Sequence, residues 1–258
     1  MPFANIEVGS VGPRASIMQN RPDQLNPLST ETLRALVDAA HRLDEQPEVK
    51  VVVLSGNGRA FSAGADLARF SGDDRGVAAQ REAADAGRQM AEAIEAMRAV
   101  TIARIHGHCV GGAVLLAAAC DLRVAADTTR FSIPELQLGI PLGWGGIPRL
   151  VREIGPAMTK ELVLSGRSFT AEEARGLGFL NRVVGVQLLD ETIEELAAQL
   201  VEKSALTLAA TKLAVNAASA AIASTSGAWS DADVLLTALS DPESRRVADD
   251  YLERLNSR

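Results

Sequence analysis

The chain reads Val49-Lys-Val-Val-Val-Leu54 and continues directly into Ser55-Gly-Asn-Gly-Arg-Ala-Phe-Ser-Ala-Gly-Ala-Asp-Leu67. The first run is β-branched and almost wholly apolar, which is typical of a strand that is covered on both faces of a sheet. The second run is rich in glycine, alanine and serine and predicts a loop at the end of that strand. A buried strand that ends in such a loop is a first indication of an α/β fold.

The same order of strand and small-residue loop recurs fifty residues further along the chain. Thr101–Ile105 reads as a strand, and His106–Val110 follows it as a loop. Gly111–Cys120 is a run of small and aliphatic residues that predicts a helix, and Leu122–Ala125 predicts another short strand. Strands that alternate with helices in this way favour an α/β class.

Three further elements flank these two units. Ala15–Gln19 reads as a strand, and Ser29 is a candidate N-cap for a helix that Pro47 ends. Val77–Met97 is rich in alanine, glutamate and arginine, and it predicts a helix with one solvated face.

Strand signals disappear in the last quarter of the chain, where three helical segments follow one another, and Asp241-Pro242 predicts the start of a new helix within the third of them. The segments are residues 191–203, 206–223 and 231–255. We therefore expect an α/β core over residues 1–200 and a helical region over residues 201–258.

The composition excludes several classes of protein. The chain has 258 residues, a net charge of −7 and an aromatic fraction of 3%, so it lacks the basic stripe and the stacking residues of a nucleic-acid binder. No apolar run reaches the roughly 20 residues that span a bilayer, and we expect no membrane partner. Cys109 and Cys120 are too few for a disulfide framework, which favours a reducing, cytoplasmic compartment.

Two small-residue loops are candidates for ligand binding through the backbone. Ala63-Gly64-Ala65 and Gly111-Gly112-Ala113 each follow a predicted strand, and the second opens a helix. Together they can supply two N–H donors to an oxyanion; alternatively, small residues there only allow close packing. The first loop is not a dinucleotide fingerprint, because the last glycine of that pattern is replaced by Phe61.

Glu135 is a single carboxyl in the apolar stretch Phe131–Pro141, directly after Pro134. Burial there would raise its pKa and suit it to general acid or base chemistry, whereas a surface or salt-bridged glutamate is the alternative. The glycine-rich run Gly143–Leu150 lacks the lysine of a phosphate-binding P-loop, and we interpret it as a flexible pocket wall. Histidines at 106 and 108 lack a second ligand pair, so no metal site is expected.

Six stretches in a fixed order resemble a known family. They are Asn20-Arg-Pro-x-x-Leu-Asn26; Val51–Ser55 running into Phe61-Ser-Ala-Gly-Ala-Asp-Leu67; Gly107-x-x-x-Gly-Gly-Ala113 with Cys120-Asp-Leu122; Pro134-Glu-Leu-Gln-Leu-Gly-Ile140 with Gly145-Gly-x-x-Arg-Leu150; Glu161–Gly166; and Ala171–Val184. These stretches, over roughly residues 15–200, resemble the crotonase superfamily, the enoyl-CoA hydratase/isomerase proteins.

The resemblance implies a spiral of ββα repeats with a C-terminal helical trimerisation region, and hence a homotrimer or a dimer of trimers. It also implies an acyl-CoA thioester as substrate, with coenzyme A as part of that substrate and no separate cofactor. The family binds the thioester oxygen with two backbone N–H groups and stabilises an enolate. By position these donors are those of Ala65 and Gly112.

One departure from the family bears on the reaction. The hydratases that the chain resembles use two glutamates to hold and activate a water; one matches Glu135, but the other position is Leu115. A leucine cannot hold or deprotonate water, so the resemblance favours double-bond isomerisation with Glu135 as acid and base. A hydratase with weak or altered chemistry and a non-catalytic acyl-CoA-binding protein are the alternatives.

The resemblance also implies contacts to the substrate. Residues expected to contact coenzyme A or the acyl group are Gln24, Leu25, Ala63, Asp66, Leu67, Gly111, Leu115, Pro134, Leu138 and Gly143. Family members often place lysines near the phosphates, but Asp23 and Ala68 occupy those positions here, so the basic contacts must come from Arg69 or a neighbouring subunit.

Overall fold

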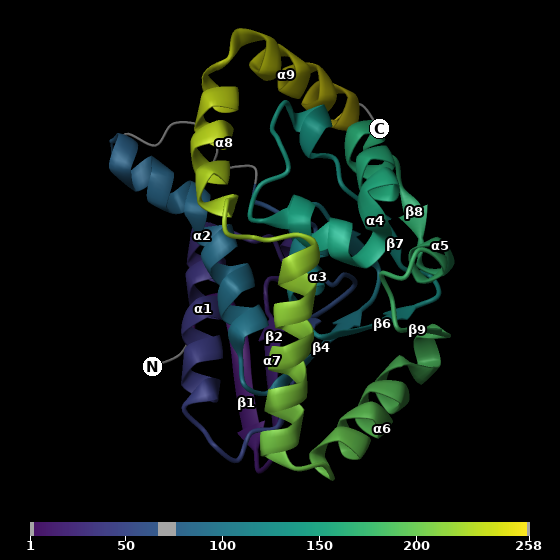
Figure 1. Cartoon of the computed structure of the whole chain (residues 1–258). Helices are drawn as coiled ribbons and strands as arrows, with labels where there is room; N and C mark the ends of the chain where they lie inside the picture. The colour runs from purple at the N-terminus through teal and green to yellow at the C-terminus, as the bar shows by residue number, and fades with distance from the viewer. Residues whose placement is uncertain (1–2, 67–75, 257–258) are drawn as a thin grey trace.

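A six-stranded sheet lies at the centre of the fold in the computed structural model, which describes residues 3–66 and 76–256 (Figure 1). Its order is β1-β2-β3-β4-β6-β9, and every neighbouring pair is parallel except β1 with β2. The strands are β1 (Ile6–Val11), β2 (Arg14–Gln19), β3 (Val51–Gly56), β4 (Val100–Ile105), β6 (Leu122–Ala126) and β9 (Arg182–Val184).

A second sheet of three short strands, β5 (His108–Val110), β7 (Arg130–Ser132) and β8 (Phe169–Thr170), lies beside the first. β5 pairs parallel with β7, and Ser62 forms an isolated bridge with Cys109 of β5. The chain therefore places one strand in each sheet before a helix: β4 and β5 precede α3 (Gly112–Ala119), and β6 and β7 precede α4 (Gly146–Ser165). This repetition is the expected ββα order.

The remaining helices and turns surround the two sheets (Figure 1). They are η1 (Pro22–Gln24), α1 (Thr30–Asp44), α2 (Val77–Ala96), η3 (Glu135–Leu138), α5 (Ala171–Gly176), η4 (Val186–Leu188), α6 (Leu189–Val201), α7 (Ala205–Ile222), η5 (Ala228–Ser230), α8 (Asp231–Ser240) and α9 (Pro242–Asn256).

The local signals for helix ends are confirmed. The Ser29 side chain accepts a hydrogen bond from the Thr32 N–H (3.2 Å) and caps α1, which ends at Asp44, ahead of Pro47. The new helix expected at Pro242 is α9.

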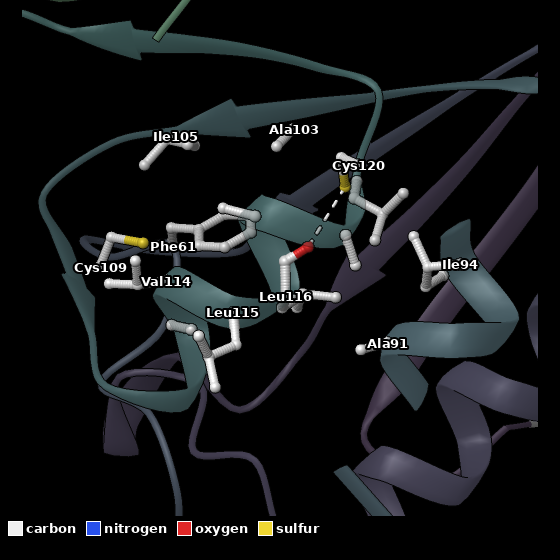
Figure 2. Close-up of a cluster of buried hydrophobic side chains, with 14 of the residues drawn as sticks. Phe61, Ala91, Ile94, Ala103, Ile105, Cys109, Val114, Leu115, Leu116 and Cys120 are labelled. Atoms are coloured by element: carbon white, nitrogen blue, oxygen red, sulfur yellow. Dashed lines mark hydrogen bonds between the residues drawn. The ribbon is translucent and has the colours of Figure 1, made fainter. Parts of the chain in front are cut away.

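The helix α3 is apolar on every face because it is enclosed by other elements. Figure 2 shows Phe61 and Ile105 on one side of α3, with Ile94 of α2 nearby, whereas Leu115 points away from Phe61. The buried thiol of Cys120 donates to the Leu116 carbonyl (3.4 Å), and burial raises its pKa to about 12. Such a thiol packs like a small apolar side chain and is not reactive.

The sequence prediction omitted β1, β9 and all three strands of the second sheet. β1 is an edge strand that ends in Val11, which is 83% exposed, and it carries the polar residues Glu7 and Ser10. The strands of the second sheet have only two or three residues, so pairing with distant segments rather than local pattern determines them.

The helix α7 lies against the core through polar contacts and exposes its apolar side chains. Its Lys212 ammonium lies 2.7 Å from an Asp121 carboxylate oxygen and donates to the Ala99 carbonyl (3.0 Å). Leu206, Leu213 and Ile222 are each more than 70% exposed. By length and composition alone α7 is apolar enough to cross a membrane, with none of its residues buried.

The last helix, α9, packs on η3 at the other end of the core (Figure 1). A β-carbon on Gly139, which follows η3, would lie 2.0 Å from the Ser244 carbonyl oxygen, so the two backbones are in direct contact. A cavity of ≈ 410 Å³ remains between them, lined on the α9 side by Tyr251 and Arg254.

Candidate functional site

The two small-residue loops of the sequence meet at the N-terminus of α3. A β-carbon on Gly64 would lie 2.3 Å from the Val110 carbonyl oxygen and 3.5 Å from the Gly112 nitrogen. Gly64 also has φ +89°, so both its conformation and its surroundings require glycine. The absence of side chains therefore lets the two loops approach through their backbones.

A hydrogen-bond network fixes the first of these loops beside α1. The Leu28 N–H donates to the Gly64 carbonyl (2.8 Å), and the Asp66 N–H donates to the Leu28 carbonyl (3.3 Å). The Ser62 hydroxyl accepts from the Gly64 N–H (3.1 Å). Ala65, between these anchors, is held in place on both sides.

The N–H groups of Ala65 and Gly112 differ from those of their neighbours. The Gly111 N–H donates to the Ser132 carbonyl (2.8 Å), but neither Ala65 nor Gly112 is a backbone donor in any hydrogen bond of residues 3–66 and 76–256. Gly112 is the first residue of α3, where an amide has no acceptor within its helix. Both amides are available to an external acceptor.

Glu135 begins η3 directly after the buried Pro134, and its carboxyl lies against the loop before α3. A β-carbon on Gly111 would lie 2.5 Å from Oε1 of Glu135. Its Oε2 is buried with no hydrogen-bond partner in the described part of the chain. Burial raises the pKa of Glu135 to about 7, as expected from its apolar setting. At neutral pH the group can therefore both accept and return a proton.

Leu115 lies one helical turn into α3 and is fully buried. A β-carbon on Gly146 would lie 2.6 Å from its side chain, so Leu115 packs on the first turn of α4. Among the other predicted contacts, Leu138 ends η3 and Gly143 lies just before α4, and both are half-buried. This side of the site is apolar at the position where the hydratases that the chain resembles have their second glutamate.

The glycine-rich run before α4 is fixed rather than flexible, which corrects the sequence interpretation. Arg149 is buried and donates to the carbonyls of Trp144 (3.1 Å) and Gly145 (3.2 Å), while its guanidinium pairs with Glu95 of α2 (2.6 Å). The Gly145 N–H donates to Asp231 of α8 (2.8 Å). The signal for this anchoring was the arginine, but its ionic partner, Glu95, lies 54 residues away in the sequence.

The residues expected at the coenzyme A end form a separate rim. Gln24 is exposed at the end of η1, and the Ala63 N–H donates to the Leu25 carbonyl (2.8 Å). Arg21, which the sequence analysis did not single out, contacts Gln24 and pairs with Asp66 (3.2 Å). These contacts connect the rim to the Gly64 loop and not to Glu135. Leu67, Ala68 and Arg69 lie outside the described residues.

Comparison with known proteins agrees with this geometry. A family model described as enoyl-CoA hydratase/isomerase matches residues 14–258. Crotonyl-CoA hydratase of Syntrophomonas wolfei is 34% identical over 84% of this chain and 83% of its own length. A peroxisomal Delta(3,5)-Delta(2,4)-dienoyl-CoA isomerase of Arabidopsis thaliana is 37% identical over 75% of this chain and 73% of its own length.

Solved structures give the same result. An enoyl-CoA hydratase of Bacillus anthracis has a TM-score of 0.78 at 34% identity and covers 82% of both chains. One from Mycobacterium avium subsp. paratuberculosis has a TM-score of 0.88 at 26% identity, over 96% of this chain and 99% of that one. The expected superfamily and spiral fold are therefore confirmed, and the chain belongs to the enoyl-CoA hydratase/isomerase family of enzymes, the crotonase superfamily.

Proposed function

We propose that this enzyme moves the double bond of a 3-enoyl-CoA thioester into conjugation, with Glu135 as the acid and base. The observation that carries the proposal is the environment of Glu135. Its carboxyl is buried against Gly111, no charged group among residues 3–66 and 76–256 shifts its pKa, and burial raises that pKa to about 7. A single such carboxylate is sufficient for a proton shift between two carbons.

The thioester oxygen is held by the N–H groups of Ala65 and Gly112. Both come from backbone segments in contact at Gly64, and neither donates within the described residues. Fixed amide donors of this kind stabilise the negative charge that develops on the oxygen, and each is worth about 3 kcal/mol of transition-state stabilisation. The dipole of α3, which begins at Gly112, adds to that stabilisation.

The reaction then needs no co-reactant. The Glu135 carboxylate removes a proton from C2, and the C–H electron pair moves into the dienolate whose oxygen is bound by the two amides. The protonated Glu135 then delivers the proton to C4 as the double bond forms between C2 and C3. The carboxylate is regenerated, and the product is the conjugated 2-enoyl-CoA.

The names of relatives favour the alternative, hydration, because many of them are called hydratases. Leu115 supports isomerisation instead. Its side chain is buried and packs on Gly146, so it provides no polar group for a nucleophilic water. One carboxylate that faces an apolar wall suits a proton transfer between carbons better than the activation of water.

We assign coenzyme A to the rim formed by η1 and the Gly64 loop. Gln24, Leu25, Ala63 and Asp66 lie there, and the guanidinium of Arg21 beside them is the cation that we propose for the phosphates. Arginine presents a planar set of donors that suits phosphate oxygens. Binding a phosphate would weaken the Arg21–Asp66 ion pair.

We further propose that residues 201–258 assemble the chain into a homotrimer or a dimer of trimers in the cytoplasm. The exposed apolar side chains of α7, with Leu206 77% and Ile222 75% exposed, are the surface that a second copy would cover. Size-exclusion chromatography with light scattering tests this assembly; a monomer at micromolar concentration contradicts it.

The reaction is tested with purified protein and two thioesters. A 3-enoyl-CoA should gain the absorbance of the conjugated thioester, and Glu135→Gln should lose this activity by about 10²- to 10⁴-fold. Asp127→Asn, a change outside the site, is the control. Loss of absorbance with a 2-enoyl-CoA would establish hydration instead. No change with either thioester, together with acyl-CoA binding, would refute both reactions.

A further inference from the structure

Trp144 combines two unusual features in the loop before α4. Its φ is +60°, a left-handed conformation that a bulky side chain adopts rarely and at a cost. Backbone outliers of this kind concentrate at functional sites. The conformation is imposed by neighbours, because Arg149 donates to the Trp144 carbonyl (3.1 Å) and Asp231 accepts from the next N–H, that of Gly145 (2.8 Å).

The left-handed conformation places the indole between two helices, each of which contributes a glycine at the contact. A β-carbon on Gly87 of α2 would lie 1.9 Å from Cδ2 of the indole, and one on Gly112 of α3 would lie 2.3 Å from Cζ3. Glycine inside a helix is unfavourable relative to alanine, so Gly87 has a cost of its own. Two glycines and a left-handed tryptophan thus combine to place one ring.

The position of that ring matters because Gly112 supplies a proposed oxyanion donor. An acyl group whose oxygen is bound there, and whose C2 faces Glu135 beside Gly111, must pass along the first turn of α3. The six-membered ring of the indole contacts this turn. Trp144 is only half-buried, so part of its surface remains open to whatever lies there.

We propose that Trp144 is the specificity-determining residue for acyl chain length, and that its indole blocks the path between α2 and α3 so that the enzyme prefers short acyl groups. This inference rests on the proposed function for the placement of the thioester. The indole takes up space that additional methylenes would need, and its contact with the backbone of α2 at Gly87 and of α3 at Gly112 prevents it from moving aside toward either helix. A pocket boundary of this kind discriminates by roughly 10-fold or more for each methylene.

The experiment compares chain lengths in wild type, Trp144→Ala and Trp144→Phe. The readouts are kcat/KM for 3-hexenoyl-CoA and 3-dodecenoyl-CoA, and the calorimetric Kd of butyryl-CoA and dodecanoyl-CoA, which do not react. Wild type should prefer the short members. Trp144→Ala should raise the long-chain to short-chain ratio of kcat/KM by at least about 10-fold and lower the corresponding ratio of Kd by a similar factor, and Trp144→Phe should change both by less.

The control is Trp229→Ala, because that tryptophan is 59% exposed on η5, and its ratio should match wild type. A purely structural role for Trp144 would lower kcat/KM and raise Kd by the same factor for both chain lengths, and an unchanged ratio in a folded variant overturns the proposal. If Trp144→Ala does not fold, an unchanged ratio in Trp144→Phe and Trp144→Leu overturns it. If wild type binds acyl-CoA but does not turn over the 3-enoyl-CoA, only the proposed reaction is refuted. The ratio of Kd values for long and short acyl-CoA still tests whether Trp144 limits chain length.

Discussion

Replacing Glu135 by glutamine should change how the stability of the protein depends on pH. Burial raises the pKa of Glu135 from its ordinary value of 4.5 to about 7. The folded chain therefore keeps this proton up to about pH 7, whereas the unfolded chain loses it near pH 4.5. In that interval the native state binds more protons than the unfolded state, so wild-type stability falls as the pH rises.

The size of this effect follows from the two pKa values. The interval from 4.5 to about 7, at about 1.4 kcal/mol per pH unit, corresponds to about 3 kcal/mol. This contribution is fully present below pH 4.5 and is lost once the pH exceeds about 7. Glu135→Gln has no titrating group at this position. As the pH rises from 4.5 to above about 7, the free energy of unfolding of the variant should therefore increase relative to that of wild type by about 3 kcal/mol.

Urea unfolding of both proteins between about pH 4.5 and about pH 8 measures this difference. The protein concentration is kept constant, because assembly makes stability depend on it. Glu172→Gln is the matched control, since the Glu172 side chain is 67% exposed. If wild type and Glu135→Gln lose stability in parallel across this range, Glu135 is not the buried carboxyl described above. The same ionisation should raise kcat/KM for a 3-enoyl-CoA with pH up to a plateau above about pH 7.

Three further predictions concern packing and polar contacts. Gly87→Ala should destabilise the protein, although alanine is normally favoured in a helix by about 1 kcal/mol, because its β-carbon would lie 1.9 Å from the Trp144 ring. Urea unfolding should show the loss recovered in the double variant with Trp144→Ala, and additive effects would contradict the contact. Lys212→Met should lower the free energy of unfolding by about 3 kcal/mol in the same assay, because it leaves the Asp121 carboxylate without the cation that lies 2.7 Å away. Adding Asp121→Asn should recover part of this loss. Unchanged stability of Lys212→Met would show that this ion pair does not anchor α7. Leu115→Glu should gain measurable hydration of a 2-enoyl-CoA, and a folded variant without that gain would show that Leu115 does not determine the reaction.

The long elements of the fold were predictable because their local pattern and their tertiary role agree. β3 is β-branched and lies between β2 and β4 in the sheet, so its continuous apolar run reflects burial on both faces. The cap at Ser29 and the start of α9 at Pro242 depend only on neighbouring residues. The short strands of the second sheet were missed because Cys109 pairs with Phe131, and Phe131 with Phe169, across sequence separations that no local signal reports.

In the candidate site, too, the features that depend on neighbouring residues were predictable and those that depend on distant residues were not. The burial and raised pKa of Glu135 followed from its apolar neighbours in the sequence, and the small residues at 64 and 112 indicated a close approach of two loops. The place of Trp144 was not predictable. It depends on a positive φ and on a glycine in a different helix, and neither is visible in the residues beside it.

The packing of α9 on η3 has a consequence for the order in which the site is completed during synthesis. Glu135 leaves the ribosome more than a hundred residues before Ser244, whose backbone touches Gly139 at the end of η3. Until α9 is made and docks, η3 lacks one of its packing partners. The nascent chain can thus fold its sheets and join its two glycine loops before the turn that carries Glu135 has its full set of contacts.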